Sequence, residues 1–184
     1  MLDNIPETIA DIYLDELDII INNKLPDLLN KPEYWKTLVI NRRKPFTYRA
    51  FTYIGQLRIC LHRFEVCDEE EAFLHPHPWD GAFRLLQGSY IMKVGISKDR
   101  ISKPDFAAKV ILTPGCQYAM TNPLSFHAIT PISECFTVML NGTPYKPDFA
   151  HQDVKTTKGK DLQEMSPNEL LTHLNKYKEL LGCN

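Results

Sequence analysis

The stretch His75-Pro76-His77-Pro78-Trp79-Asp80-Gly81 places two histidines two residues apart, and a third histidine, His127, follows later in the chain. On an extended strand, side chains at i and i+2 point to the same face, so both imidazoles lie on one side. A third imidazole from a later strand completes a site of three nitrogens. Imidazole binds iron, nickel, copper and zinc, and three protein ligands leave coordination positions open. The stretch therefore predicts a metal site inside a small β-barrel.

The composition is that of a single globular domain. The chain has 184 residues, of which 43% are hydrophobic and 24% are charged. The formal net charge is −2 and no basic block is present, which argues against binding to nucleic acid or to an anionic membrane. No apolar run is long enough to span a bilayer, and the acidic start argues against a secretory signal. We therefore expect the partner to be a small-molecule substrate. The protein is expected to be a monomer or a homodimer.

The cysteine pattern indicates reduced thiols. The chain has five cysteines, an odd number, and none of them forms a CxxC pair. This usage is typical of a protein in a reducing compartment, so we expect a cytoplasmic location. The cysteines are Cys60, Cys67, Cys116, Cys135 and Cys183.

Three segments separate by pattern, within what we expect to be one structural domain. Residues 1–44 form a helical segment, 45–145 a β-barrel, and 146–184 a linker with a closing helix. Apolar residues at helical spacing predict a helix over residues 6–29, ended or kinked by Pro26. A second short helical piece is expected over residues 32–39, because Pro32 suits a first helical turn.

Short runs of β-branched and aromatic residues, separated by turn residues, fill the middle segment. About eight short strands with regular turns are typical of a β-sandwich or barrel. The expected strands cover residues 46–54, 56–66, 72–77, 82–97 with a bend at Gly88, 107–112, 116–121, 126–131 and 134–140.

The last segment ends in a well-marked helix. Residues 146–160 are polar and are expected to be irregular. Ser166, Pro167 and Glu169 make a capping box with proline in the first turn, and Gly182 suits the end of the helix. Its apolar stripe predicts a packing face, or alternatively a dimer contact.

These motifs together resemble the cupin superfamily. The block His75-x-His77, then Gly88, then Pro114-Gly115 and His127 follows the order of the cupin motifs. Residue Gly81 stands where most cupins have a glutamate ligand. The resemblance implies a cupin-type β-barrel (jelly roll) with one divalent metal bound by His75, His77 and His127.

A three-histidine cupin without the glutamate is similar to the thiol dioxygenases, the cysteine dioxygenase-like enzymes. The runs Phe83-Arg84-Leu85-Leu86-Gln87-Gly88 and Asn122-Pro123-Leu124-Ser125-Phe126-His127 carry this likeness. The resemblance implies Fe(II), a dioxygenase reaction, and dioxygen together with a small thiol or carboxylate substrate. Nickel, zinc, manganese and copper are alternatives that three imidazoles also accept. The His-x-His-Pro-Trp run is equally similar to small uncharacterised cupins.

The chain departs from the thiol dioxygenases at several positions. The cysteine and tyrosine that cross-link in the animal enzymes fall at Gly81 and near Asn141. The serine-histidine-tyrosine relay is not evident, since Met139 stands near its histidine position. No catalytic acid or base is identified from the sequence.

The resemblance also suggests substrate-binding residues. Arg49 lies where the family keeps an arginine for the substrate carboxylate, with Arg58 or Arg63 as the alternatives. Trp79 and Phe83 are expected to line the substrate site. The tyrosines that could reach an oxygen atom there are Tyr48, Tyr53, Tyr90 and Tyr118. His62, His151 and His173 belong to no such group, so we expect them to face solvent or to have local partners.

The leading hypothesis is an iron-dependent dioxygenase. Two other classes remain open: a cupin isomerase or hydrolase that uses a different metal, and a cupin that binds a ligand without converting it.

Overall fold

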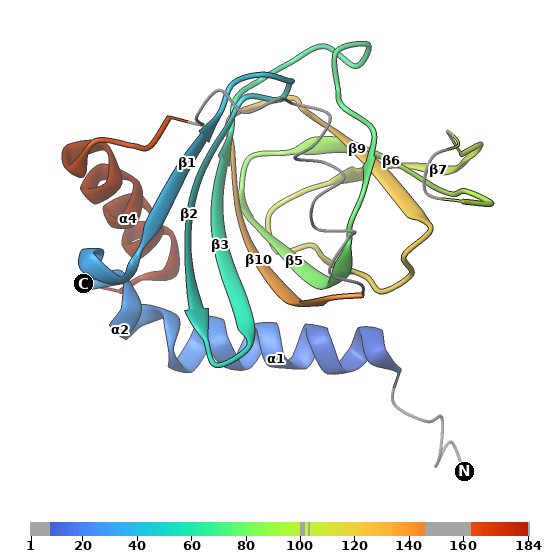
Figure 1. Cartoon of the computed structure of the whole chain (residues 1–184). Coiled ribbons are helices and arrows are strands. Elements are labelled where there is room, and N and C mark those ends of the chain that lie inside the picture. The colour runs from blue at the N-terminus through green and yellow to red at the C-terminus, as the bar shows by residue number, and fades with distance from the viewer. Residues whose placement is uncertain (1–7, 100–101, 103, 146–162, 184) are drawn as a thin grey trace.

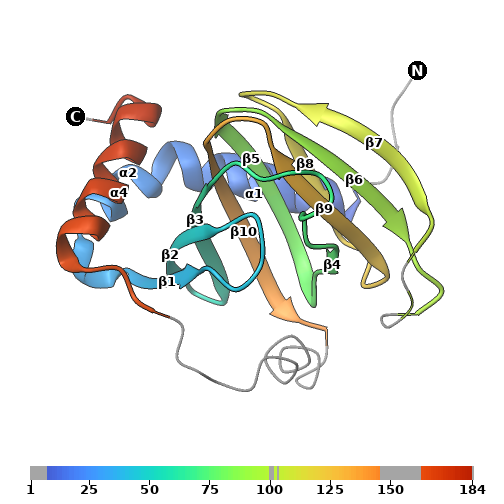
Figure 2. The same cartoon turned by 90° about the horizontal axis from the view of Figure 1, so that it is seen from above.

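The computed structural model describes residues 8–99, 102, 104–145 and 163–183 of the chain. In this part of the chain two antiparallel β-sheets face each other (Figures 1 and 2). The larger sheet has the strand order β1-β2-β3-β10-β5-β8, and the smaller one β4-β9-β6-β7. The predicted fold class is confirmed to the extent of a mainly β fold of two facing sheets with helices at both ends of the described chain.

The helices lie at the two ends of the described chain. They are α1 (Ile9–Asn23), α2 (Leu25–Leu29), the 3-10 turn η1 (Pro32–Tyr34) and α4 (Pro167–Leu181). The strands are β1 (Lys36–Ile40), β2 (Thr47–Ile54), β3 (Leu57–Phe64), β4 (His75–Pro76), β5 (Trp79–Gln87), β6 (Tyr90–Ile96), β7 (Phe106–Leu112), β8 (Gln117–Met120), β9 (Ser125–Pro131) and β10 (Cys135–Pro144).

The helix termini follow local sequence signals. The Thr8 hydroxyl accepts a hydrogen bond from the backbone N–H of Asp11, and the Asp11 carboxylate accepts one from the backbone N–H of Thr8, which makes a capping box at the start of α1. The expected break of the N-terminal helix is confirmed, and it falls at Lys24, so that Pro26 lies in the first turn of α2. The capping box at Ser166 and the left-handed Gly182 of α4 are also confirmed.

The prediction of a helix over residues 32–39 is wrong for its second half. Only η1 is helical, and β1 follows it directly. The β-branched residues Thr37 and Val39 favour a strand, and β1 pairs with β2 from Lys36 to Ile40. Tertiary pairing here overrides the weak helical signal of Pro32. The irregular segment predicted over residues 146–160 lies outside the described residues.

The bend expected at Gly88 is confirmed. Gly88 has a φ of +85°, and a side chain there would collide with the backbone carbonyl of Glu134. Glycine is therefore required for β5 to turn directly into β6, which belongs to the other sheet.

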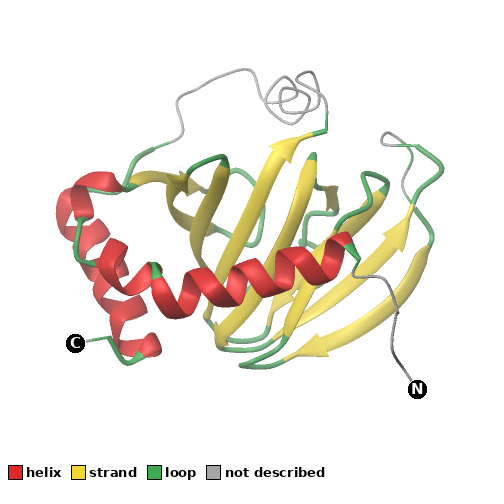
Figure 3. Ribbon diagram, turned by 90° about the horizontal axis from the view of Figure 1, so that it is seen from below, coloured by secondary structure: helices red, strands yellow, loops and turns green. Residues whose placement is uncertain are grey.

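The main apolar core lies outside the barrel, between the larger sheet and the helices. Figure 3 shows α1 lying across this outer face. The core residues of the helices, such as Leu17 and Leu174, pack against alternate residues of the strands, such as Ile59 and Leu140. Because neighbouring strand residues point to opposite faces, the residues between them face the interior of the barrel.

Helix α4 is tied to the sheet by buried polar contacts as well as by its apolar stripe. The Tyr177 hydroxyl donates hydrogen bonds to the carbonyls of His62 (2.7 Å) and Thr137 (2.9 Å). His173 Nε2 donates to the Leu61 carbonyl at 3.2 Å. The apolar stripe packs against the main core and is therefore an intramolecular packing face, except for Leu171, which is exposed; its residues are Leu170, Leu171, Leu174, Tyr177, Leu180 and Leu181. No described helix combines the length and the apolar character needed to cross a membrane.

The burial of His173 predicts a pH dependence of stability. Burial lowers the pKa of His173 from its usual 6.5 to about 4. Between these values the unfolded chain binds the proton and the folded chain does not, so the free energy of unfolding falls as the pH falls through this range. From pH 7 to pH 4.5 the free energy of unfolding should fall by about 2 kcal/mol less in His173→Gln than in the wild type. Chemical denaturation of both proteins at each pH measures this. An identical loss in both proteins would contradict the assignment.

Candidate metal centre

Strand pairing brings the three predicted histidines together. His75 lies on β4 and His127 on β9, and the two residues are directly opposed in the antiparallel ladder. His77 follows β4 by one residue, so its ring returns to the same face as that of His75. The candidate ligand atoms of His75, His77 and His127 all lie within 4.8 Å of one another.

The spacing of the imidazoles fits a single metal ion. Nε2 of His77 lies 2.9 Å from Nε2 of His127. Two nitrogens at right angles on one ion, each bonded at about 2.1 Å, are roughly 3 Å apart. The ring centroids of the three histidines are 4.7–5.1 Å apart. This arrangement is suited to three ligands on one side of an ion.

Hydrogen bonding and burial also fit ligation. His75 Nδ1 donates to the Phe73 carbonyl at 3.1 Å, which leaves the lone pair of Nε2 for a metal. His127 is 2% exposed, and its Nδ1 is buried with no hydrogen-bond partner among the described residues. An ion bound by Nε2 of His77 and of His127 would replace their close approach to each other, and it would leave Nδ1 of His127 as the ring nitrogen without a partner among the described residues.

Two of the three histidines, His77 and His127, are held in the neutral form that binds metals. Burial, together with the charges of His127 and His75, holds the pKa of His77 well below its usual value. Burial and the charge of His75 do the same for the pKa of His127. A neutral imidazole needs no deprotonation before it coordinates an ion.

No Asp or Glu of the described residues joins the cluster. Asp80 is the nearest acid in the sequence motif, and it accepts a hydrogen bond from the Tyr145 hydroxyl. Burial is the larger cause of the raised pKa of Tyr13, and the negative charge of Asp80 is the second cause. Tyr13 belongs to α1, so Asp80 faces the outside of the barrel. The donor set is therefore three neutral nitrogens.

Aromatic and apolar side chains surround the imidazoles. The Phe83 ring lies 5.2 Å from that of His77 and stacks on Tyr118 at 4.6 Å. The Trp79 ring lies 6.3 Å from that of His77. The structure thus brings Trp79 and Phe83 beside the histidines, and their role in binding a substrate stays a prediction.

The four candidate tyrosines separate into two groups. Tyr118 and Tyr90 lie inside the barrel, with their hydroxyls 3.4 Å apart. Tyr48 lies on the outer face under the Arg63 guanidinium, and Tyr53 is 56% exposed. Tyr118 is therefore the candidate closest to the cluster, with its ring 6.2 Å from that of His127.

The three candidate arginines of the sequence also separate. Arg49 faces the interior, where its Nε donates to His62 Nε2 at 2.7 Å and its charge lowers the pKa of His77, after burial and the neighbouring imidazoles. Arg58 lies over the Trp79 ring at 4.4 Å. Arg63 is on the outer face and pairs with Glu134 at 3.7 Å, so it does not face the cluster.

His62 and Asn141 also face the interior, and sequence reasoning did not single them out. His62 is 3% exposed and accepts a hydrogen bond from Arg49, so a solvent-facing ring is wrong for it and the alternative, a local partner, is confirmed. His151 lies outside the described residues. The β2–β3 hairpin around Gly55 pairs Arg49 with His62, and that register could have revealed the contact.

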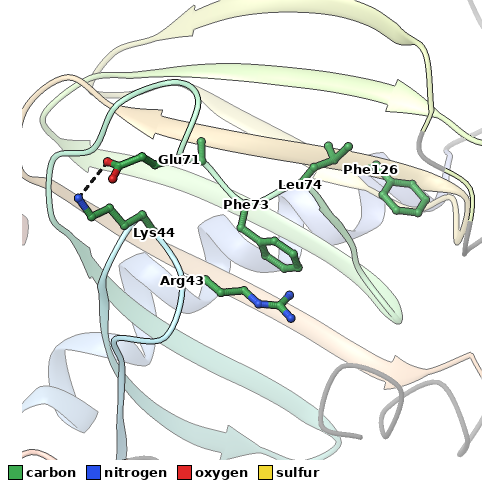
Figure 4. A pocket seen from close by; sticks show the side chains of 7 residues that line it. Arg43, Lys44, Glu71, Phe73, Leu74 and Phe126 are labelled. Atoms are coloured by element: carbon green, nitrogen blue, oxygen red, sulfur yellow. Dashed lines mark hydrogen bonds and ion pairs between the residues drawn. The ribbon is translucent and has the colours of Figure 1, made fainter. Parts of the chain in front are cut away.

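A surface pocket of about 500 Å³ meets the cluster at Phe73. The Phe73 ring lines this pocket and stacks on His75 at 5.3 Å, and the Arg43 guanidinium lies 4.0 Å from the Phe73 ring centre (Figure 4). Lys44 is neutralised by Glu71 at 2.9 Å. Arg43 forms no ion pair with an Asp or Glu in the described part of the chain, so its positive charge on the pocket wall is uncompensated there.

No protein-family model and no curated protein matches the sequence. Among solved structures, the chain is similar to hydroxypropylphosphonic acid epoxidase from S. wedmorenis, with a TM-score of 0.47 and 14% identity over 60% of this chain and 56% of that chain. It is also similar to KdgF from Halomonas sp., with a TM-score of 0.43 and 14% identity over 62% of this chain and 91% of that chain. The chain spans little more than half the length of the epoxidase.

The geometry predicts one divalent metal per chain. His77→Ala and His127→Ala should each weaken Fe(II) or Zn(II) binding by more than the roughly 10–100-fold that loss of an outer-shell partner costs. Equilibrium dialysis under anaerobic conditions, with elemental analysis, measures this. The control is His173→Gln, which removes a buried histidine outside the cluster. Equal metal binding by the wild type and both alanine variants would contradict the site.

Proposed function

We propose that this chain is a metal-dependent oxidoreductase that binds Fe(II) through His75, His77 and His127. Its substrates are dioxygen and a small acid that carries a thiol group. The observation that carries the proposal is the three-nitrogen cluster, free of carboxylates among the described residues, beside two arginines of the same barrel interior.

The arginines support an anionic substrate. Neither Arg49 nor Arg58 forms an ion pair with an Asp or Glu in the described part of the chain. Burial lowers the pKa of Arg49, which shows that its surroundings disfavour the positive charge. Buried charges are normally paired, because removal from water costs several kcal/mol unless an opposite charge compensates. A carboxylate on the substrate would supply that compensation.

The neutral donor set supports a thiol. Iron held by these residues would supply open coordination positions at which the substrate and dioxygen could meet, and the thiol sulfur would supply the four electrons that reduce dioxygen. Three neutral imidazoles contribute no negative charge, so an anionic group of the substrate is favoured beside them. A thiolate is such a group, and it is a soft ligand suited to iron.

The residues of this chain would then bind and orient the substrate. The arginines hold the carboxylate, the rings of Phe83 and Trp79 exclude water, and the histidines hold the metal. Transfer of both atoms of dioxygen to sulfur converts the thiol to a sulfinic acid, and this reaction needs no further reductant.

Oxygen consumption tests the proposal. Iron-loaded protein should consume one dioxygen per molecule of 3-mercaptopropionate or cysteine, measured with an oxygen electrode, while the sulfinate is quantified by mass spectrometry. Metal-free protein and His77→Ala should be inactive. The matched control substrate is 3-(methylthio)propionate, which keeps the carboxylate but has no ionisable thiol and should not react.

Iron binding without oxygen uptake for any thiol acid would contradict the dioxygenase reaction, and would favour a hydrolase, an isomerase or a ligand-binding protein. Equal uptake with the methylthio analogue would show that the thiol is not the reacting group.

A further inference from the structure

The surface pocket of about 500 Å³ beside Phe73 has no role in the proposed reaction. Phe73, Leu74 and Phe126 supply apolar surface to its wall, and Arg43 supplies a guanidinium group (Figure 4). A volume of roughly 300–1,000 Å³ and a largely apolar lining with a few polar groups are typical of small-molecule sites. The pocket, which we call the Arg43 pocket, therefore has the size and the lining of a ligand site.

The charge of the pocket favours an anion. Lys44 is paired with Glu71 at 2.9 Å, whereas Arg43 forms no ion pair with an Asp or Glu of the described residues. The Arg43 guanidinium lies over the Phe73 ring, 4.0 Å from its centre. A guanidinium on an aromatic face can still donate hydrogen bonds from its edge to the oxygens of an acidic group. A ligand with a negative charge would thus compensate Arg43.

The apolar wall determines what else the ligand carries. Phe126 is 6% exposed, and Phe73 and Leu74 are half-buried. Covering this surface is favourable in proportion to the apolar area that is removed from water. The ligand class that fits both parts of the wall is an organic anion with an apolar body.

The two segments that form the pocket are held together before any ligand binds. The Phe73 N–H donates to the Lys44 carbonyl at 3.0 Å, and Lys44 forms a parallel β-bridge with Ala72. The ion pair between Lys44 and Glu71 joins the same two segments. A site that is formed in advance loses less free energy to ordering when the ligand binds.

The pocket and the metal centre share Phe73. Its ring stacks on that of His75 at 5.3 Å with an interplanar angle of 1°, and its carbonyl accepts the hydrogen bond of His75 Nδ1 at 3.1 Å. Phe126 directly precedes His127 on β9. The positive charge of Arg43 therefore lies near the histidines, where it opposes the binding of a divalent cation. An anion bound to Arg43 would remove this repulsion.

We propose that the Arg43 pocket is an accessory site for an organic anion with an apolar body, and that its occupancy strengthens metal binding by the three histidines. The anion is a second ligand, additional to the substrate in the barrel interior. The inference requires the metal centre but not the proposed reaction.

Isothermal titration calorimetry tests the site with naphthalene-2-sulfonate, whose sulfonate stays charged and is a weak ligand for Zn(II). Two control probes each lack one half of the recognised structure: methyl 2-naphthyl sulfone is neutral, and methanesulfonate has no apolar ring. The wild type should bind naphthalene-2-sulfonate saturably at one site. Both control probes should bind at least about 10-fold more weakly.

Arg43→Met should weaken the binding of naphthalene-2-sulfonate by at least about 10-fold, because methionine keeps the contact with Phe73 but removes the charge. The matched control is Arg42→Met, since Arg42 is the preceding arginine, is exposed and does not line the pocket. This control should bind the probe as the wild type does.

The link to the metal centre is tested by Zn(II) titrations with and without the probe. Saturating naphthalene-2-sulfonate should raise the Zn(II) affinity of the wild type by about 5-fold, and Zn(II) should raise the affinity for the probe by the same factor. Arg43→Met should show the raised Zn(II) affinity without the probe, and no further response to it.

No saturable binding of naphthalene-2-sulfonate, or equal affinity in the wild type and Arg43→Met, would overturn the site. An equal Zn(II) affinity with and without the probe would overturn the link to the metal centre. A protein that passes these tests but consumes no dioxygen would contradict the proposed function alone. One that oxidises a thiol acid but does not bind the probe would contradict this inference alone.

Discussion

The main constraint on this structure is the free-energy cost of burying polar and cationic groups between two β-sheets. Four imidazoles, two guanidinium groups and a carboxamide face the barrel interior, where burial lowers the pKa of His62, His77 and His127. Desolvation makes such an interior unfavourable unless the groups find partners. The apolar core on the other side of the larger sheet, where α1, α2 and α4 pack, provides the stability that this interior lacks. The outer face of the larger sheet therefore packs against the helices, and its inner face carries polar groups near the histidines.

The same division explains how the site is positioned. Alternate residues of β3 and β10 pack against the helices, and the residues between them face the histidines, so most of the interior side chains lie on strands, whereas His77 lies between β4 and β5. His75 and His127 are fixed against each other by the β4–β9 pairing. His77 and Trp79 follow at two-residue intervals, which continues the site toward Arg58. The three histidines and the arginines Arg49 and Arg58 therefore lie in the same barrel interior.

Local sequence signals were sufficient for much of this. The spacing of His75 and His77 predicted a shared face, and the caps of α4 and the turn at Gly88 were read directly from residue type. The residues 36–39 were misassigned because their strand exists only through pairing with β2. Arg58 and Asn141 lie far apart in the sequence, and only the β3–β10 register shows that they are neighbours. The residue types at Gly81 and Asn141 already exclude a cysteine–tyrosine cross-link at these positions. That Asn141 Oδ1 is buried without a hydrogen-bond partner among the described residues is seen only in the structure.

The convergence of three imidazoles on one ion is the central claim, and X-ray absorption spectroscopy of the Zn(II)-loaded or Fe(II)-loaded protein tests it most directly. The account predicts three imidazole nitrogens at about 2.0–2.2 Å in the wild type and two in His127→Ala, with no protein sulfur in the coordination shell. A shell with one imidazole or none, or one that contains a cysteine sulfur such as that of Cys60, would contradict it.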